Sequence, residues 1–255
     1  MSRQSRLILV LQLFENGRPV WTVDEISRAL RISVSTAYRH VRELVGCGFL
    51  DPVTGAGYAL GPAFIRYDRV LRQSDPLIRI ADPVMTALLE RTSQNGTLAL
   101  CRRFKDCVMC VHEVRGEKSR GQTSYERGVA MPMFLGATSK VILAQLPDRA
   151  LRGIYLANEQ RIRKLLRIRD WSEFKSELRE IKRAGFALTD SEVAEGRVGL
   201  AAPIARNGQV AACLSLIVDA RGWDRRKVSA FIPDVVGAAG RISLSLGKAV
   251  PVISR

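Results

Sequence analysis

The sequence predicts an α+β protein of two domains. Close to the N-terminus, segments with helical spacing are followed by a glycine-containing hairpin pattern. Further along, strand-like runs are interrupted by helical segments, and the last two runs are joined by an Asn-Gly turn, which favours an antiparallel hairpin. The length of 255 residues fits two domains at roughly 150 residues each. These observations indicate a mainly helical first domain and a second domain in which helices flank a sheet.

The segment from Thr22 to Gly48 has the pattern of two short helices joined by a tight turn. Thr22 and Glu25 form a capping box, in which a hydroxyl and a carboxylate satisfy free backbone N–H groups at a helix start. Ser33 is the expected N-cap of the second helix, which Gly46 and Gly48 end. Apolar residues recur at helical spacing in both helices, namely Val23, Ile26 and Leu30, then Ala37, Val41 and Leu44.

The opposite face of the second helix is polar and basic. It carries Ser35, Arg39 and Arg42, with Tyr38 on one flank and Thr36 on the other. In a DNA major groove, arginine can bind guanine O6 and N7 while hydroxyls reach phosphates, so this face suits a recognition helix. A helical hairpin with a solvated basic face fits the same residues equally well.

The residues that follow favour the recognition helix. Residues 49–51 and 58–60 are short apolar runs on either side of a glycine-containing turn, which predicts a β-hairpin. A first helix is expected over residues 5–16, so the order is that of a winged helix-turn-helix, whose wing usually lies on flanking phosphates. The expected DNA contacts are Thr22, Arg31, Ser33, Ser35, Thr36, Tyr38, Arg39, Arg42 and Thr54.

This segment resembles the DNA-binding domain of the IclR family of bacterial transcriptional regulators. The matching residues are Thr22, Glu25, Ile26, Leu30, Ser35, Thr36, Tyr38, Arg39, Leu44, Gly48, Phe49, Leu50, Tyr58, Leu60 and Gly61. The resemblance continues to the C-terminus and implies a GAF-like effector-binding fold for the second domain. We expect the winged helix-turn-helix over residues 1–62, a linker helix over 63–74, and an effector-binding and oligomerisation domain over 75–255.

The remaining elements follow from local pattern. The linker helix is amphipathic, is able to pack against a partner chain, and is broken before Pro76. A polar loop with an edge is expected over residues 115–127. Further helices are expected over residues 76–92, 136–145, 147–155, 171–184 and 223–246. Strands are expected over residues 96–101, 107–111, 186–188, 198–204 and 209–218.

The net charge of +15 and the isoelectric point of about 10.3 favour a polyanionic partner, with nucleic acid the first candidate. Residues 1–73 hold ten Arg, no Lys and six acidic residues, a net charge of +4. Most of the charge therefore lies downstream. The run Arg161, Arg163, Lys164, Arg167 and Arg169 fits either a solvated face or a surface that attracts DNA non-specifically.

The sequence predicts a cytoplasmic protein. No stretch approaches the roughly 20 apolar residues that a membrane-spanning helix needs. The apolar residues near the N-terminus have helical spacing and are followed by no small-residue cleavage site, so they do not form a signal peptide. Five cysteines without a framework spacing fit a reducing compartment.

An enzyme or a metal site has weak support. There are two histidines in the chain, and no phosphate-binding loop, nucleophile elbow or paired carboxylates are present, so we expect no catalytic residue, metal or cofactor. Cys107 and Cys110 are three residues apart on an expected strand and should face opposite sides, whereas Cys110 and His112 should share a face. A metal- or thiol-using sensor built on Cys101 and these residues is the alternative. A third hypothesis is a basic architectural protein without a ligand.

The resemblance implies where an effector binds. The expected contacts are Met131, Ala137, Thr138, Ser139, Thr189, Asp190, Gly199 and Ser215. A helix starting near Ala137 offers free backbone N–H groups and a positive dipole end, which suit a carboxylate. Family effectors are often small organic or aromatic acids. Ser139 stands where glycine is common and Gly199 where some members have cysteine, so the pocket differs in size or polarity.

The resemblance and the charge together predict three partners. They are an operator in double-stranded DNA, a small-molecule effector, and a second copy of the chain in a dimer or tetramer. A symmetric dimer presents its recognition helices roughly 34 Å apart, so the operator should be a palindrome. No membrane is involved.

Overall fold

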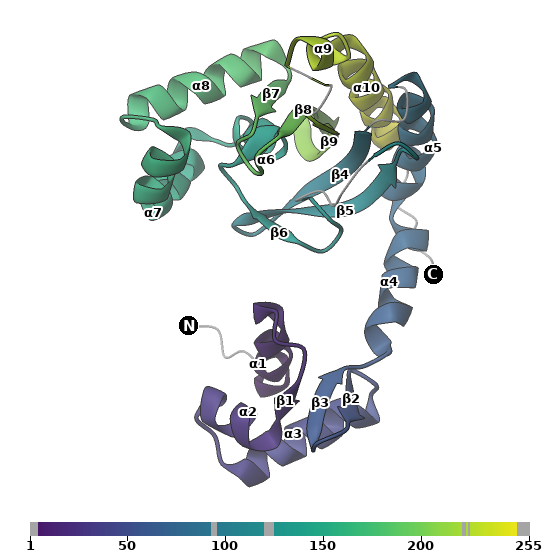
Figure 1. Ribbon diagram of the computed structural model, residues 1–255, viewed down its shortest axis with the longest axis vertical. Coiled ribbons are helices and arrows are strands. Elements are labelled where there is room, and N and C mark those ends of the chain that lie inside the picture. The colour runs from purple at the N-terminus through teal and green to yellow at the C-terminus, as the bar shows by residue number, and fades with distance from the viewer. Residues whose placement is uncertain (1–4, 93–95, 120–124, 221–222, 224, 249–255) are drawn as a thin grey trace. The chain divides into compact units, whose positions relative to one another are not determined.

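The computed structural model describes residues 5–92, 96–119, 125–220, 223 and 225–248 (Figure 1). The chain divides into two compact units, Met1–Ser74 and Asp75–Arg255. The first unit is a winged helix-turn-helix and the second combines a sheet with helices, so the α+β class is confirmed. None of the described helices is long and apolar enough to cross a lipid bilayer.

The first unit contains the three helices and the hairpin that the sequence predicts. Its elements are α1 (Arg6–Gln12), which continues as the 3-10 turn Leu13–Asn16, α2 (Val23–Leu30), α3 (Val34–Gly46), β2 (Leu50–Val53) and β3 (Gly57–Leu60). The apolar stripes meet in one core, made of Val10, Phe14, Ile26, Ala37, Val41, Leu44 and Leu50. Because the stripes of α2 and α3 both face this core, the polar face of α3 is turned to solvent.

Both expected helix caps form. The backbone N–H of Glu25 donates to the Thr22 hydroxyl at 3.3 Å, and the backbone N–H of Thr22 donates to the Glu25 carboxylate at 2.9 Å. This backbone bond and the nearby Arg18 guanidinium lower the pKa of Glu25 to about 2. At the second helix, the Thr36 N–H donates to the Ser33 hydroxyl at 3.2 Å. The turn between the helices is closed by Arg31, whose φ of 53° lies in the left-handed region.

The wing has a third strand that the sequence analysis missed. The two residues of β1 (Trp21–Thr22) pair with β3, which gives the order β1-β3-β2. Two residues are too few to display an alternating pattern, so no periodicity signalled this strand. The expected hairpin itself is present, with Leu50 paired to Leu60 and Val53 paired to Gly57. The helix expected over residues 63–74 is α4 (Ala63–Ser74).

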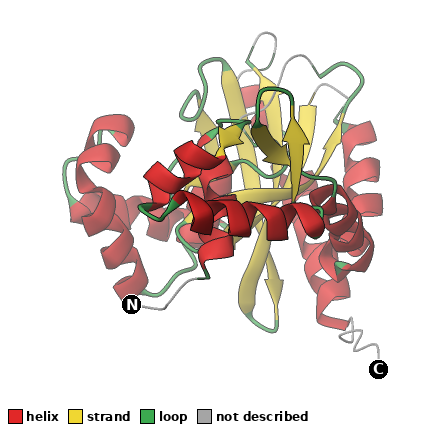
Figure 2. Cartoon of the chain, turned by 90° about the horizontal axis from the view of Figure 1, so that it is seen from below, coloured by secondary structure: helices red, strands yellow, loops and turns green. Residues whose placement is uncertain are grey.

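The second unit is built on a six-stranded antiparallel sheet in the order β6-β5-β4-β9-β8-β7 (yellow in Figure 2). The strands are β4 (Gly96–Phe104), β5 (Cys107–Arg115), β6 (Ala130–Pro132), β7 (Ala187–Asp190), β8 (Arg197–Arg206) and β9 (Gln209–Asp219). The expected Asn-Gly hairpin joins β8 and β9, and both turn residues have positive φ. The three-residue strand β6 was not predicted. Residues 120–124 of the expected loop lie outside the described residues.

Helices cover both faces of this sheet. One face packs against α5 (Pro76–Arg91) and α10 (Ile232–Lys248), and the other packs against α6 (Gly136–Leu143), with α7 (Asp148–Leu166) and α8 (Trp171–Ala184) outside it. Two helix predictions were wrong. The helix expected to stop at residue 155 runs to Leu166. The helix expected over residues 223–246 is divided, with α9 (Arg225–Ser229) ending before α10. Pro233 lies in the first turn of α10, where its missing N–H is tolerated.

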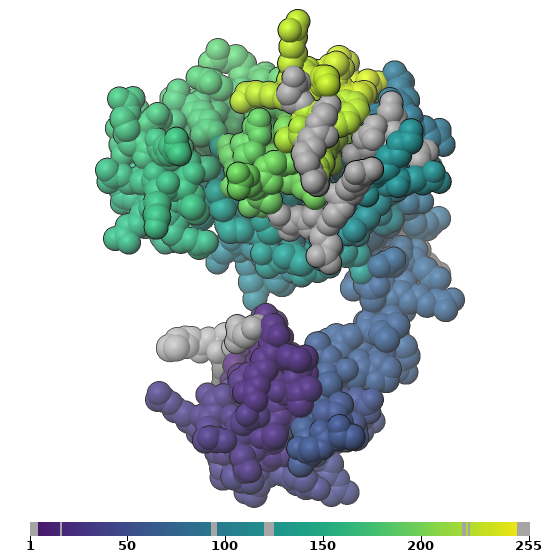
Figure 3. Space-filling model, in the orientation of Figure 1, coloured from purple at the N-terminus to yellow at the C-terminus, as the bar shows by residue number. Residues whose placement is uncertain are grey.

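The long α7 carries most of the basic run. Arg161, Arg163 and Lys164 are exposed on it, and Arg167 and Arg169 are exposed just beyond its end. Figure 3 shows α7 and α8 as a teal-green lobe on the surface of the second unit. Arg163 pairs with an acid of its own helix at 3.8 Å, and Arg169 pairs with Glu173 at 3.1 Å. The run is therefore an exposed and partly neutralised surface.

A bulge in the sheet overturns the expected Cys110–His112 pair. The register between β4 and β5 shifts between Leu100 and Cys101, so Val111 is an extra residue and the alternation of faces reverses there. Cys110 is buried in the cluster under α6. The ring of His112 lies on the other face, where its Nε2 is 2.7 Å from the Asp82 carboxylate on α5. The two side chains cannot act as a dyad.

Close packing at Gly61 generates a prediction about the first unit. A Cβ on Gly61 would lie 2.4 Å from the carbonyl oxygen of Gly48, which is itself held by the N–H of Ala63 at 2.9 Å. Gly61→Ala should therefore destabilise the winged helix-turn-helix by about 1–3 kcal/mol. Urea unfolding, with hydrogen exchange in α3 as the local reporter, measures the change.

The matched control is Gly46→Ala, because Gly46 is helical and no described atom beyond its own helix and chain neighbours lies within 4 Å of that Cβ position. This variant should be neutral or stabilising by up to about 1 kcal/mol. A Gly61→Ala protein as stable as the control would contradict the described contact between the wing and the end of α3.

Candidate functional site

The exposed face of α3 brings together most of the expected DNA contacts. Ser35, Tyr38, Arg39 and Arg42 are exposed on it, and Thr36 is half-buried beside them. The spacing of the arginines is set by the helix, and both side chains are exposed, so they are available to an anion. This face offers two cations, a phenol and two hydroxyls on one rigid element, which is what contact with a DNA groove needs.

The other expected DNA contacts have structural roles as well. The hydroxyl of Thr22 is bound in the capping box, and that of Ser33 holds the first turn of α3. Thr54 is exposed at the tip of the wing, beside Gly55 and Ala56, which both have positive φ. These positions shape the first unit whether or not they reach DNA.

One exposed apolar residue on α3 escaped the sequence analysis. Val34 is 51% exposed and lies one turn before Tyr38, which is 53% exposed. The two side chains form a small apolar strip beside the arginines. The sequence did carry a signal for its exposure, since Val34 stands between two serines at the start of the helix. Such a strip can contact thymine methyl groups in a major groove.

The start of α6 is the chemically richest place in the second unit. All eight residues of this helix are buried, so its polar groups need partners from the protein. The N–H of Gly136 donates to the Glu192 carboxylate at 3.1 Å, and the N–H of Ala137 donates to the Thr189 hydroxyl at 3.1 Å. Two of the free N–H groups that were expected to hold a ligand are thus bound within the chain.

Side chains of α6 are also paired. The hydroxyls of Thr138 and Ser215 are 2.9 Å apart, and both residues are almost fully buried. The hydroxyl of Ser139 lies 3.4 Å from that of Tyr125, which donates to the carbonyl of Leu135 at 2.9 Å. Burial raises the pKa of Tyr125 well above its usual value, so this phenol stays protonated.

A row of three buried thiols lies under α6. Cys101 pairs in register with Cys110 on one neighbouring strand and with Cys213 on the other. Burial raises the pKa of Cys101, so its thiol is protonated and a poor nucleophile and ligand. Within the described ranges, no group of three or more His, Cys, Asp or Glu residues is placed to hold a metal ion. The geometry gives the thiol-sensor alternative no support.

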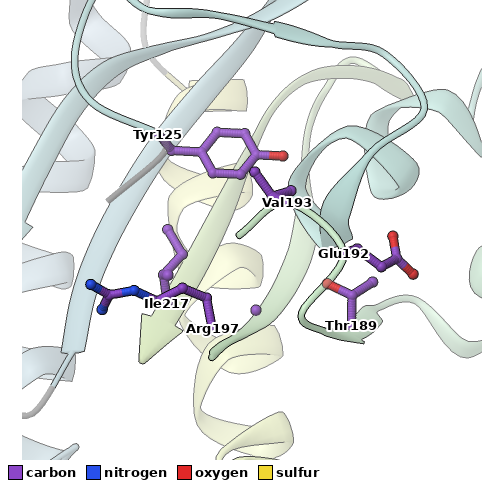
Figure 4. Close-up of a pocket in the computed structure, with 7 residues that line it drawn as sticks. Tyr125, Thr189, Glu192, Val193, Arg197 and Ile217 are labelled. Carbon is purple, nitrogen blue, oxygen red and sulfur yellow. The ribbon is translucent and has the colours of Figure 1, made fainter. Parts of the chain in front are cut away.

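A small cavity of about 30 Å³ opens beside this network (Figure 4). Its walls are Tyr125, Thr189, Glu192, Val193, Arg197, Gly199 and Ile217. The side chain of Val193 lies beside the hydroxyl end of Tyr125, and the carboxylate of Glu192 points away from the phenol ring. The Arg197 guanidinium lies 4.0 Å from the Asp219 carboxylate. The lining thus combines polar and charged side chains with the apolar Val193 and Ile217.

Only some of the expected effector contacts line the cavity. Thr189 and Gly199 line the cavity, and Ala137 lies next to both. Thr138, Ser139 and Ser215 lie behind these three, in the hydrogen-bonded layer. Two expected contacts lie elsewhere, since Met131 is on β6 and Asp190 is exposed.

Five lining residues were missed by sequence analysis, namely Tyr125, Glu192, Val193, Arg197 and Ile217. Four of these come from segments whose spacing carries no signal of burial. Asp190 was expected as a contact, but nothing in the local spacing showed that Glu192, two residues further on, lines the cavity instead.

Comparison with known proteins identifies both units. Residues 70–244 match the family model of the bacterial transcriptional regulator IclR C-terminal domain, and residues 5–53 match that of the IclR helix-turn-helix domain. The chain belongs to the IclR family of bacterial transcriptional regulators. It is a DNA-binding regulator with an effector-binding domain and not an enzyme, and its partners are DNA and a small molecule.

Individual relatives of this IclR-family chain are distant. The DNA-binding transcriptional repressor YiaJ of Escherichia coli is 25% identical over 201 residues, which cover 78% of this chain and 70% of YiaJ. The crystal structure of Thermotoga maritima IclR has a TM-score of 0.68 at 23% identity, covering 95% of this chain and 97% of that one. An IclR homologue of Microbacterium hydrocarbonoxydans, crystallised with 4-hydroxybenzoate, has a TM-score of 0.73 at 20% identity, covering 96% and 98%.

The buried hydroxyl pair predicts a stability effect. Thr138→Val keeps the shape of the side chain but leaves the Ser215 hydroxyl without its partner on α6, so it should destabilise the second unit by about 1–3 kcal/mol. The double variant Thr138→Val/Ser215→Ala should recover part of that loss, because no buried hydroxyl is then orphaned. Denaturant unfolding of the single and double variants measures the coupling. If the stability losses of the two single variants simply add in the double variant, a direct hydrogen bond between Thr138 and Ser215 is contradicted.

Proposed function

We propose that this protein is a cytoplasmic regulator whose affinity for a palindromic operator is controlled by a small organic acid bound in the cavity beside α6. The observation that carries the proposal is the cavity itself. It lies in the effector-binding unit of an IclR-family chain and is walled by two of the positions that the family resemblance implies, Thr189 and Gly199.

An acid is favoured as the effector class by the surroundings of the cavity. Arg197 is on its wall, and the positive end of α6 is adjacent. The apolar side, with Val193 and Ile217, suits a carbon skeleton or a ring. The 4-hydroxybenzoate complex of the Microbacterium homologue supports an aromatic acid as one possibility within this class.

The volume of the cavity bears on how an effector enters. About 30 Å³ holds roughly one water molecule, whereas ligand sites usually measure about 300–1,000 Å³. We therefore expect effector binding to select a state in which this cavity is larger. A ligand that binds one of two states shifts the equilibrium between them, and coupling that shift to the DNA-binding unit changes operator affinity.

Operator recognition is proposed to involve two copies of the chain. In the linker helix α4, residues 63–74, the apolar residues Ile65, Tyr67, Val70 and Leu71 are all more than half exposed. A partner copy that covers this strip would remove apolar area from water and bring two recognition helices onto one duplex. The assembly is then a dimer, or a tetramer formed from two dimers.

The effector proposal is tested with a panel of carboxylic acids against the purified full-length chain. An effector should raise the midpoint of thermal unfolding, since a ligand that binds only the folded state stabilises it. The same acid should change operator affinity by about 5–150-fold, as a coupling of about 1–3 kcal/mol requires. Amines and sugars of similar size form the control set. Stabilisation by these controls, and by no acid, would refute the effector class.

The recognition helix is tested with Arg39→Ala. If Arg39 contacts a base edge, operator affinity should fall by about 1–3 kcal/mol while affinity for random DNA changes much less. Arg241→Ala is the control. This substitution removes the same charge, but Arg241 is exposed on α10 of the other unit. Electrophoretic mobility shifts on operator and random duplexes measure both. Equal losses on the two duplexes would mean that Arg39 binds phosphate, and unchanged binding would reject the helix assignment.

A further inference from the structure

The inference begins with a buried lysine on α6. The side chain of Lys140 is only 3% exposed, and its ammonium nitrogen lies 2.6 Å from a carboxylate oxygen of Glu192 and 2.6 Å from one of Glu177. A buried ammonium is held in the folded state only when carboxylates or other acceptors surround it. The ammonium of Lys140 therefore requires negatively charged partners in the positions that the carboxylates of Glu192 and Glu177 occupy.

The two carboxylates have different surroundings. Glu177 lies on α8 and, together with Lys140, lines a second groove. Glu192 lines the small cavity, and its second oxygen accepts the N–H of Gly136 at 3.1 Å. One carboxylate thus joins the buried ammonium, the first turn of α6 and the cavity wall. Glu177 pairs with Lys140 and lines the other groove.

Glu192 belongs to a compact turn between β7 and β8. The turn is closed by the N–H of Ser191, which donates to the carbonyl of Arg197 at 2.8 Å. Val193, like Glu192, packs against the start of α6. A methyl group of Val193 lies 2.5 Å from the position that a Cβ on Gly136 would occupy. The turn is held against α6 by one carboxylate and one apolar side chain, so loss of the carboxylate bonds would loosen it.

We propose that Lys140 is the residue that binds the effector's carboxylate, and that Glu192 occupies this position as an internal competitor until the effector displaces it. The inference rests on the proposed function, namely that the cavity accepts an organic acid. Displacement releases the turn over residues 191–196, and this movement enlarges a cavity that otherwise holds about one water molecule.

Charge balance favours exchange over simple addition. An acid that entered without displacing Glu192 would place a third carboxylate beside one buried ammonium that already has two. Exchange leaves Lys140 with two carboxylates and returns an acceptor to the Gly136 N–H. The displaced Glu192 moves toward solvent with its turn, where its charge is hydrated. Glu192 thereby selects for ligands that carry a carboxylate.

The experiment uses formate as the probe, because it is a carboxylate without a skeleton. In Glu192→Ala the competitor is gone, so formate should bind at least tenfold more tightly than to the parent chain. Formate should also slow hydrogen exchange of the Gly136 amide in this variant. Glu177→Ala is the matched control, since it removes the other partner of Lys140 at the same distance but frees neither the Gly136 N–H nor the cavity wall. Its formate affinity should therefore stay within about threefold of the parent chain. Sodium chloride at equal ionic strength accompanies each titration.

Glu192→Gln provides a second variant that retains the shape of the side chain and should fold where the alanine variant does not. It should show faster exchange over residues 191–196 than the parent chain, and a formate affinity between those of the parent and the alanine variant. Equal gains in Glu192→Ala and Glu177→Ala, or no gain in either Glu192 variant, would overturn the inference.

The inference and the proposed function fail in different ways. An acid that releases the operator from the parent chain, but binds Glu192→Ala no more tightly, would refute the competitor and leave the function standing. Tight formate binding by Glu192→Ala, with no acid able to change operator affinity in the parent chain, would support the internal competitor and refute the proposed control of DNA binding.

Discussion

Complete burial of α6 is the constraint on which the second unit depends. A helix start normally leaves several N–H groups to water, but here they must be satisfied by the protein. Several polar groups at the start of α6 consequently bind segments that are distant in the sequence. Glu192 and Thr189 bind its N–H groups, Ser215 binds a hydroxyl, Tyr125 approaches another, and Glu177 pairs with the lysine. The cavity lies where these segments converge, so its position follows from the need to satisfy α6.

The same constraint places charge and apolar surface side by side. Lys140 would be costly to bury alone, and its two carboxylates make it tolerable without making the pair a strong source of stability. Such a pair is better suited to being exchanged than to holding a core together, because another carboxylate can replace one partner at little cost. The apolar contacts under α6 hold the fold, and the exchange that we propose involves only the polar contacts of its first turns.

The first unit obeys simpler rules, and the sequence predicted it almost completely. Caps at Thr22 and Ser33 act within four residues, and the apolar stripes of α2 and α3 repeat every turn, so local spacing encodes both. What spacing could not provide was the two-residue strand β1 and the exposed Val34. The strand exists through pairing with β3, and the valine is exposed because its neighbours on α3 fill the core.

In the second unit, some features were determined by the sequence and others only by the tertiary structure. Its sheet, its Asn-Gly hairpin and the start of α6 followed from local pattern and family resemblance. The bulge that turns His112 away from Cys110, the extension of α7 through a basic run, and the contact of Glu192 with Lys140 did not. These features depend on register, on solvent exposure of a charged face and on groups 52 residues apart. Local spacing fixes which face a residue takes on its own element, but only packing of the elements fixes which buried charges meet.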